Sequence, residues 1–92
     1  ANTRAAGNGG DGIGASAGSV TNCAAKSNAG HGISASSGTV TNSLAQSNGN
    51  DGIAAASGVV AFCRASSNNV NNNGSIDIDA VGATRTGNNP TP

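Results

Sequence analysis

The chain has 92 residues and a formal net charge of zero, made of four basic and four acidic side chains. This balance argues against a nucleic-acid partner, and no stretch is apolar enough for insertion into a membrane. One aromatic residue and 15 glycines exclude a core of the usual aromatic-rich kind and, taken alone, are typical of disorder.

An internal repeat, in which Asp11 aligns with His31 and Asp51, argues for order instead. Residues 11–28 read DGIGASAGSVTNCAAKSN and residues 31–48 read HGISASSGTVTNSLAQSN, which are identical at 11 of 18 positions. The third copy, DGIAAASGVVAFCRASSN, covers residues 51–68. We therefore divide the chain into an N-terminal arm (1–8), three 20-residue coils (9–68), and an irregular fourth coil with a C-terminal tail (69–92).

Within each copy the local pattern is that of β-strands. Ile13 and Ala15 alternate with a glycine, and β-branched Thr21 follows Val20. Helical repeats need roughly 33 residues or more per unit, so a 20-residue unit is expected to be one turn of a β-helix. The predicted fold class is all-β: a single-stranded parallel β-helix, or solenoid, of three coils plus a partial fourth.

Stacked coils should align identical side chains into ladders. Isoleucine and valine columns supply the inner apolar surface, and an asparagine column is expected in a turn, where side-chain amides hydrogen-bond to their copies above and below. Asn22 and Asn42 are expected at a bend that needs left-handed backbone. The columns are Ile13, Ile33 and Ile53; Val20, Val40 and Val60; and Asn28, Asn48 and Asn68.

Two cysteines share one column but lie two coils apart. Coils pair at about 4.8 Å, so about 9.6 Å separates Cys23 from Cys63. Because a disulfide needs Cα atoms within about 7 Å, we expect two buried thiols that are not joined, with Ser43 between them. Their spacing matches no metal-ligand pattern, and no cofactor is expected.

The phrases G-[DH]-G-I, G-x-V-[TA]-[NF]-[CS] and A-x-S-N resemble the coils of the right-handed parallel β-helices of the pectate-lyase-like superfamily. The resemblance covers Gly9 to Asn68. It implies a right-handed coil. It does not imply one activity, because that superfamily includes polysaccharide lyases and hydrolases, phage tailspikes, adhesins and copper-site maturation proteins.

One column carries titratable side chains. Asp11, His31 and Asp51 align, so an imidazole is expected about 5 Å from a carboxylate on either side. Such a group could act as acid and base or bind a metal. The interpretation we favour is that Asp and His are ordinary turn residues before glycine.

A second carboxylate pair lies in SIDIDA. Asp77 and Asp79 are expected on one strand face, with Ile76 and Ile78 on the other. Paired carboxylates could serve a glycoside hydrolase or bind calcium. Solvated charges on an edge strand are the favoured interpretation, so no catalytic residue is assigned and the chain is not expected to be an enzyme.

Two outward surfaces differ between the coils. Hydroxyl side chains flank the valine in the first two coils, an arrangement that resembles ice-binding solenoids. In the third coil Val59, Ala61 and Phe62 form an apolar outer patch instead, which either the C-terminal segment, through Ile76, Ile78 and Val81, or a neighbouring subunit should cover. The hydroxyl residues are Ser19, Thr21, Thr39 and Thr41.

The ends of the predicted solenoid suggest what the protein does. Uncapped ends expose strand edges and carry little repulsive charge, which favours head-to-tail stacking. The chain begins ANTRAAGN without an initiating Met, which suits a secreted mature protein or a piece of a longer chain. We expect a non-catalytic, extracellular or cell-surface structural protein that forms a homo-oligomer or filament. The alternatives are a fragment of a carbohydrate-active or carbohydrate-binding β-helix with a polysaccharide partner, and an ice-binding solenoid.

Overall fold

The computed structural model describes residues 3–69, 77–79 and 84–88. All regular structure in these ranges is β, and none of it is a helix that could cross a membrane. The strands are β1 (Arg4–Ala6), β2 (Ile13–Gly14), β3 (Ser19–Thr21), β4 (Ala24–Lys26), β5 (Ile33–Ser34), β6 (Thr39–Thr41), β7 (Leu44–Gln46), β8 (Ile53–Ala54), β9 (Val59–Ala61), β10 (Arg64–Ser66), β11 (Ile78–Asp79) and β12 (Thr84–Thr86).

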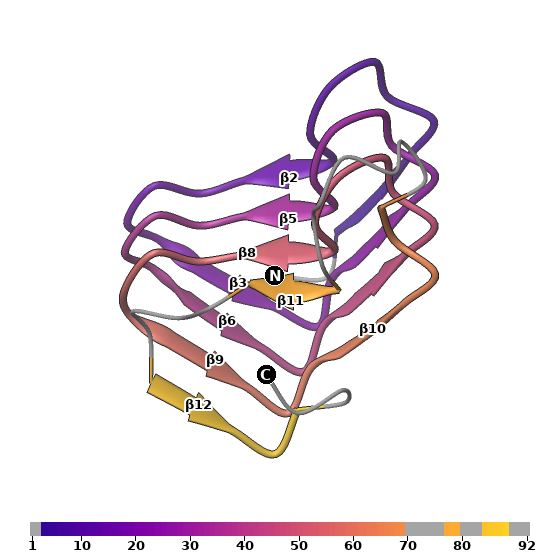
Figure 1. Cartoon of the computed structure of the whole chain (residues 1–92). Helices are drawn as coiled ribbons and strands as arrows, with labels where there is room; N and C mark the ends of the chain where they lie inside the picture. Colours follow the sequence, from indigo (N-terminus) through magenta and orange to yellow (C-terminus); the bar gives the residue numbers. More distant parts are fainter. Residues whose placement is uncertain (1–2, 70–76, 80–83, 89–92) are drawn as a thin grey trace.

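The strands form three parallel sheets that the chain visits in turn (Figure 1). Their strand orders are β1-β4-β7-β10, β2-β5-β8-β11 and β3-β6-β9-β12. In the first three coils each strand pairs with the strand at the same position of the next coil, as Ile13 pairs with Ile33 and Val20 with Val40. The prediction of an all-β parallel solenoid of about three turns is therefore confirmed.

Small and branched side chains fill the narrow space between the three sheets. Fully burying one isoleucine or valine stabilises the fold by about 1.5 to 3 kcal/mol, so these two columns supply most of the apolar stabilisation. Ile13, at the N-terminal end of its column, is only partly buried. The core is Val20, Cys23, Ala25, Ile33, Ala35, Val40, Ala45, Ile53, Ala55, Val60, Cys63, Ala65 and Ile78.

Each coil turns at two bends with left-handed backbone. The first lies at Asn22, Asn42 and Phe62, with φ angles of 53°, 49° and 53°. Left-handed backbone at the two asparagines agrees with the sequence expectation, because asparagine tolerates this region better than most residues. The second bend was not expected from the sequence, and it lies at Ser27 (φ 59°), Ser47 (φ 57°) and Ser67 (φ 54°).

The cysteine column lies inside the coil and contains no disulfide. Cys23 and Cys63 are both buried, and the hydroxyl oxygen of Ser43 between them accepts the backbone N–H of Cys23 at 3.2 Å. Burial raises the pKa of the Cys63 thiol above its ordinary value of 9.0, and hydrogen bonds with the backbone of Ser43 and Ala61 oppose this in part.

The fourth coil has a different period. Ile78 pairs with Ile53 and Thr84 with Val59, which is a 25-residue offset in both sheets. Ile78 extends the isoleucine column and is buried. Ile76 and Val81, which the sequence analysis assigned to the same coil, lie outside the described residues.

Candidate functional site

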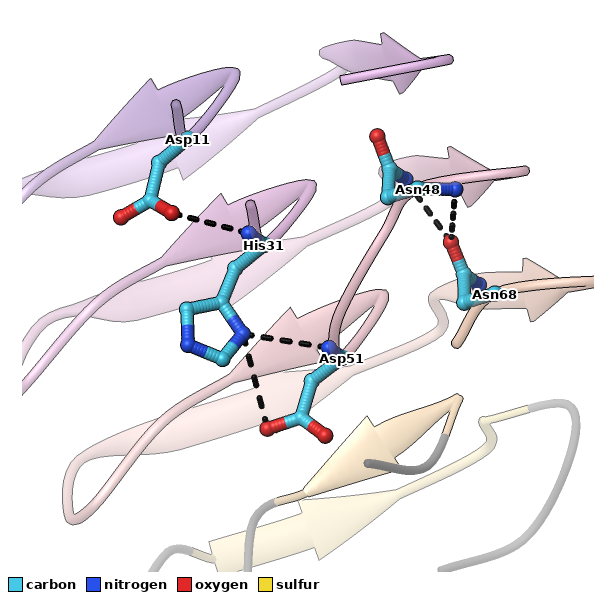
Figure 2. A network of polar contacts seen from close by, with 5 residues as sticks. All are labelled: Asp11, His31, Asn48, Asp51 and Asn68. Atoms are coloured by element: carbon cyan, nitrogen blue, oxygen red, sulfur yellow. Dashed lines mark hydrogen bonds and ion pairs between the residues drawn. The ribbon is translucent and has the colours of Figure 1, made fainter. Parts of the chain in front are cut away.

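The asparagine ladder, Asn28, Asn48 and Asn68, lies in the loops that follow β4, β7 and β10. Figure 2 shows its members Asn48 and Asn68. Asn28 donates its backbone N–H and its Nδ2–H to Oδ1 of Asn48, at 3.1 and 2.9 Å. Asn48 donates the same pair to Oδ1 of Asn68, at 3.0 and 2.8 Å. Its Nδ2 also donates to the carbonyl of Ala25 at 3.2 Å. Along the ladder, each asparagine therefore donates to the side-chain oxygen in the next coil and accepts with its own Oδ1 from the coil before it.

Two residues outside the repeated coils extend the ladder. Asn8 donates its N–H and Nδ2–H to Oδ1 of Asn28, at 3.1 and 2.8 Å. At the other end Asn68 donates its N–H and Nδ2–H to Oδ1 of Asp77, at 3.0 Å each. Asp77 is therefore not the solvated strand charge that the sequence suggested, because its carboxylate is the last acceptor of the ladder.

Asp77 stands where the repeated coils have a glycine. Gly52 directly precedes Ile53, and Asp77 directly precedes Ile78, the partner of Ile53. A Cβ at Gly52 would overlap the side-chain amide of Asn68, so a full asparagine column requires glycine here. In the fourth coil the aspartate itself fills the position that the amide of a further asparagine would take.

The titratable column forms a second, more exposed ladder (Figure 2). Oδ1 of Asp11 accepts the backbone N–H of His31 at 2.8 Å, and Nδ1 of His31 accepts the backbone N–H of Asp51 at 3.2 Å. Oδ2 of Asp51 lies 3.6 Å from the same Nδ1. The Asp51 carboxylate thus lies within 4 Å of the imidazole, whereas the Asp11 carboxylate is hydrogen-bonded to the backbone of His31. An acceptor Nδ1 places the proton of the neutral ring on Nε2.

The same face carries a shallow pocket of about 420 Å³. His31, Asp51 and Asp79 lie around it together with Ser34 and Ser36, so it brings two members of the Asp11, His31 and Asp51 column next to one member of the Asp77 and Asp79 pair. Within residues 3–69, 77–79 and 84–88, no three acidic, histidine or cysteine side chains are placed to hold a metal ion. The lining is His31, Ser34, Ser36, Asp51, Ala54, Ala55, Ala56 and Asp79.

The apolar patch of the third coil is only partly covered by the chain itself. Ala61 is buried and Val59 is half-buried, whereas Phe62 is 61% exposed. The ring of Phe62 lies over Gly87, where an added Cβ would come within 2.5 Å of a ring carbon. The C-terminal segment therefore contacts the patch at Gly87 and leaves most of the ring open to solvent.

The hydroxyl side chains of β3 and β6 form one short row. The Thr21 and Thr41 hydroxyl oxygens lie 3.3 Å apart and share a hydrogen bond. Thr41 then pairs with Ala61, and Thr39 with Val59, so the hydroxyl surface ends at the third coil. The row is therefore only two coils deep.

Strand edges lie at both ends of the described solenoid. The N-terminal edge is β1, β2 and β3, and the C-terminal edge is β10, β11 and β12; each of these strands ends one of the three sheets. Edge strands present backbone N–H and C=O groups that can pair with another chain. The N-terminal edge strand β1 and the C-terminal edge strand β10 belong to one sheet, and the residue register runs unbroken from β1 through β4 and β7 to β10.

Sequence reasoning did not find Asn8 and Asn88, and it found Asp77 but not its role in the ladder. Asn8 and Asn28 have the same separation as Asn28 and Asn48, so the repeat period itself could have found Asn8. Asp77 and Asn88 follow the 25-residue offset of the fourth coil. The 20-residue repeat of the sequence does not predict this offset. Asn88 is buried below Cys63, whose N–H it accepts at 3.0 Å, and it donates to the carbonyl of Val60 at 2.9 Å.

Comparisons with protein-family models, with curated proteins and with solved structures found no match to this chain.

Proposed function

We propose that this protein is a non-catalytic structural β-solenoid that associates end to end with further copies of itself. The observation that carries the proposal is the match between its two ends: every strand of the N-terminal edge belongs to a sheet that also ends in a strand of the C-terminal edge. Stacking β1 on β10, β2 on β11 and β3 on β12 would extend all three sheets at once. A contact between two different surfaces of this kind builds a linear assembly.

The register of the first sheet predicts which residues of two stacked copies would meet. In the first sheet Arg4 pairs with Ala24 and Arg64 with Leu44, so one column contains all four residues. A second copy that continues the sheet would place its Arg4 opposite Arg64 and its Ala5 opposite Ala65. The asparagine ladder would continue through its Asn8. Among the described residues, no group donates to Oδ1 of Asn8, which leaves that acceptor available to a second copy.

An extracellular or cell-surface location belongs to the same proposal, as does membership of the right-handed, pectate-lyase-like β-helices. The support for the second is the coil phrase that runs from Gly9 to Asn68, together with the parallel three-sheet architecture.

A carbohydrate-binding role is the second candidate function. The pocket on the outer face favours it, since hydroxyl, imidazole and carboxylate groups line about 420 Å³. The test is a titration of the labelled protein with soluble polysaccharides by NMR. Shifts confined to His31, Ser34, Ser36, Asp51 and Asp79 would support the role, and unchanged spectra would remove it.

End-to-end association is tested by sedimentation velocity over a wide concentration range, followed by electron microscopy of the most concentrated sample. We expect a concentration-dependent series of species and filaments of uniform width. The Cα extents of one subunit, 26 × 25 × 19 Å, set the expected width at one subunit without lateral bundling. A single monomeric species at every concentration would overturn the proposal.

Ice binding, the third expectation, is tested by whether the protein changes the habit of growing ice crystals.

A further inference from the structure

We propose that Asp77 is an autoinhibitory cap: its carboxylate occupies the place in the asparagine ladder that Asn8 of a second copy would take on stacking. This inference rests on the proposed end-to-end association and adds a control point to it. The partner is a second copy of this chain. The contact that opposes stacking, between Asn68 and Asp77, lies within a single chain.

The place of an incoming Asn8 follows from the register. Within one chain β1 pairs with β4, and this pairing lets Asn8 donate to Asn28 in the next coil. If β1 of a second copy extended the sheet beyond β10, its Asn8 would lie beyond Asn68 and its Oδ1 would accept the N–H and Nδ2–H of Asn68. These are the two donors that Asp77 already engages, at 3.0 Å each.

The glycine column shows that the two arrangements exclude each other. A Cβ at Gly12, Gly32 or Gly52 would overlap the amide of the asparagine beside it. Asp77 has both a Cβ and a carboxylate at the equivalent point of the fourth coil. The asparagine of a second copy therefore cannot enter until the side chain of Asp77 moves away.

The cap competes efficiently because it belongs to the same chain. Asn68 and Asp77 are nine residues apart, and a short connection gives an effective concentration in the millimolar range. Each hydrogen bond to a charged group changes an equilibrium by about tenfold or more. Removing the cap should therefore strengthen stacking by at least about tenfold.

The experiment compares the 92-residue chain with three variants in sedimentation velocity. Asp77→Gly restores the glycine of the column and opens the ladder; we expect association at a concentration at least about tenfold lower than in the wild type. Asp77→Asn removes the charge but keeps an Oδ1 acceptor, so it should remain capped. Asp79→Gly removes the same charge two residues away, in a column where Gly14 already occurs, and should behave as the wild type.

Amide hydrogen exchange at Asn68 supplies a second measurement at concentrations where every variant is monomeric. The N–H of Asn68 should be protected in the wild type and in Asp77→Asn, and it should exchange rapidly in Asp77→Gly. At higher concentrations, where Asp77→Gly stacks, the N–H of Asn68 should be protected again because Asn8 of the second copy accepts it. Adding Asn8→Ala to Asp77→Gly removes the incoming acceptor and should cancel both the return of protection and the gain in association.

The outcomes separate the cap from the proposed function. Equal association of the wild type and Asp77→Gly would overturn the cap while leaving end-to-end stacking in place. An equal gain in Asp79→Gly would also overturn it, because charge alone would then explain the effect. A monomeric Asp77→Gly at every concentration, with Asn68 exchanging rapidly, would overturn the end-to-end function itself.

Discussion

Asn28 directs two hydrogen bonds, from its backbone and from its side chain, at the single Oδ1 of Asn48. Asn48 must at the same time donate to Ala25 and Asn68. We predict that Asn48→Asp destabilises the protein by at least about 3 kcal/mol, because a fully buried carboxylate would lose these donors and face the oxygen of Asn68. Urea denaturation measures the loss.

The matched control for this prediction is the opposite substitution, aspartate to asparagine, at the C-terminal end of the ladder. Asp77→Asn should cost clearly less, about 1 to 2 kcal/mol, because it loses the charge on the acceptor but the last position only has to accept. Similar losses in the two variants would mean that position within the ladder does not decide which side chain is tolerated.

The glycines of the repeat fall into two classes with opposite predicted responses. A Cβ at Gly32 would lie 2.5 Å from Nδ2 of Asn48 and 2.6 Å from the carbonyl oxygen of Gly52, so Gly32→Ala should cost more than about 2 kcal/mol. Gly14 has nothing within 4 Å and shares a column with Ser34 and Ala54. Gly14→Ala should therefore stabilise the chain by about 0.4 to 1 kcal/mol, through the unfolded state. Thermal denaturation distinguishes the two, and a loss at Gly14 would contradict this explanation.

Burial of Cys63 predicts a dependence of stability on alkaline pH. The pKa of its thiol is raised above 9.0 in the folded chain, so both states hold the proton below that pH and stability is unaffected. Above it the unfolded chain ionises first, and the stability contributed by the protonated thiol is lost as pH rises towards the folded pKa. Cys63→Ser should remove this part of the alkaline loss, and Ser43 shows that the column accepts serine. The urea midpoints of the wild type and of Cys63→Ser at neutral and alkaline pH test this prediction. An equal loss of stability at alkaline pH in the two proteins would refute it.

The bend at Phe62 should be strained. Its φ is 53°, in a column whose other members include Asn22 and Asn42. Left-handed backbone at a residue other than glycine costs of order 1 to 3 kcal/mol, and asparagine tolerates it best. We predict that Phe62→Asn raises the melting temperature by a few degrees, although the ring loses its contact with Gly87. Phe62→Ala is the control, and an equal rise there would assign the gain to loss of the ring rather than to the bend.

The repeated coils could be predicted from the sequence because the length of the repeat alone decides which residues lie next to each other in neighbouring coils. A constant 20-residue offset places Ile13 against Ile33 and Asn28 against Asn48, whatever the exact path of the turns. The left-handed serines could not be predicted in this way. Serine has no strong preference for that region, and the bend at Ser27 and Ser47 follows from closing the coil.

The ends of the solenoid were less predictable than its middle. Asn8 keeps the 20-residue offset and follows Ala5, the partner of Ala25, so the repeat period could have placed it in the ladder although the phrase around it is incomplete. Asp77 reaches Asn68 from nine residues away, across the longer offset of the fourth coil. A carboxylate before Ile78 is typical of an exposed strand end in sequence, and only the position of the neighbouring amide shows that it closes a ladder.

Charge at the stacking contact supplies the last prediction. Continuing the first sheet would place Arg4 of one copy opposite Arg64 of another, both exposed, and like charges directly across strands are destabilising. Arg4→Ala should therefore tighten association by about twofold to fivefold, and added salt should tighten the wild type more than this variant. Lys26→Ala removes the same charge within the coil stack, where it faces Ala6 and Gln46, and should leave association unchanged. Sedimentation equilibrium at low and high salt measures both effects. An equal response of the two variants would show that net charge, and not this register, governs the contact.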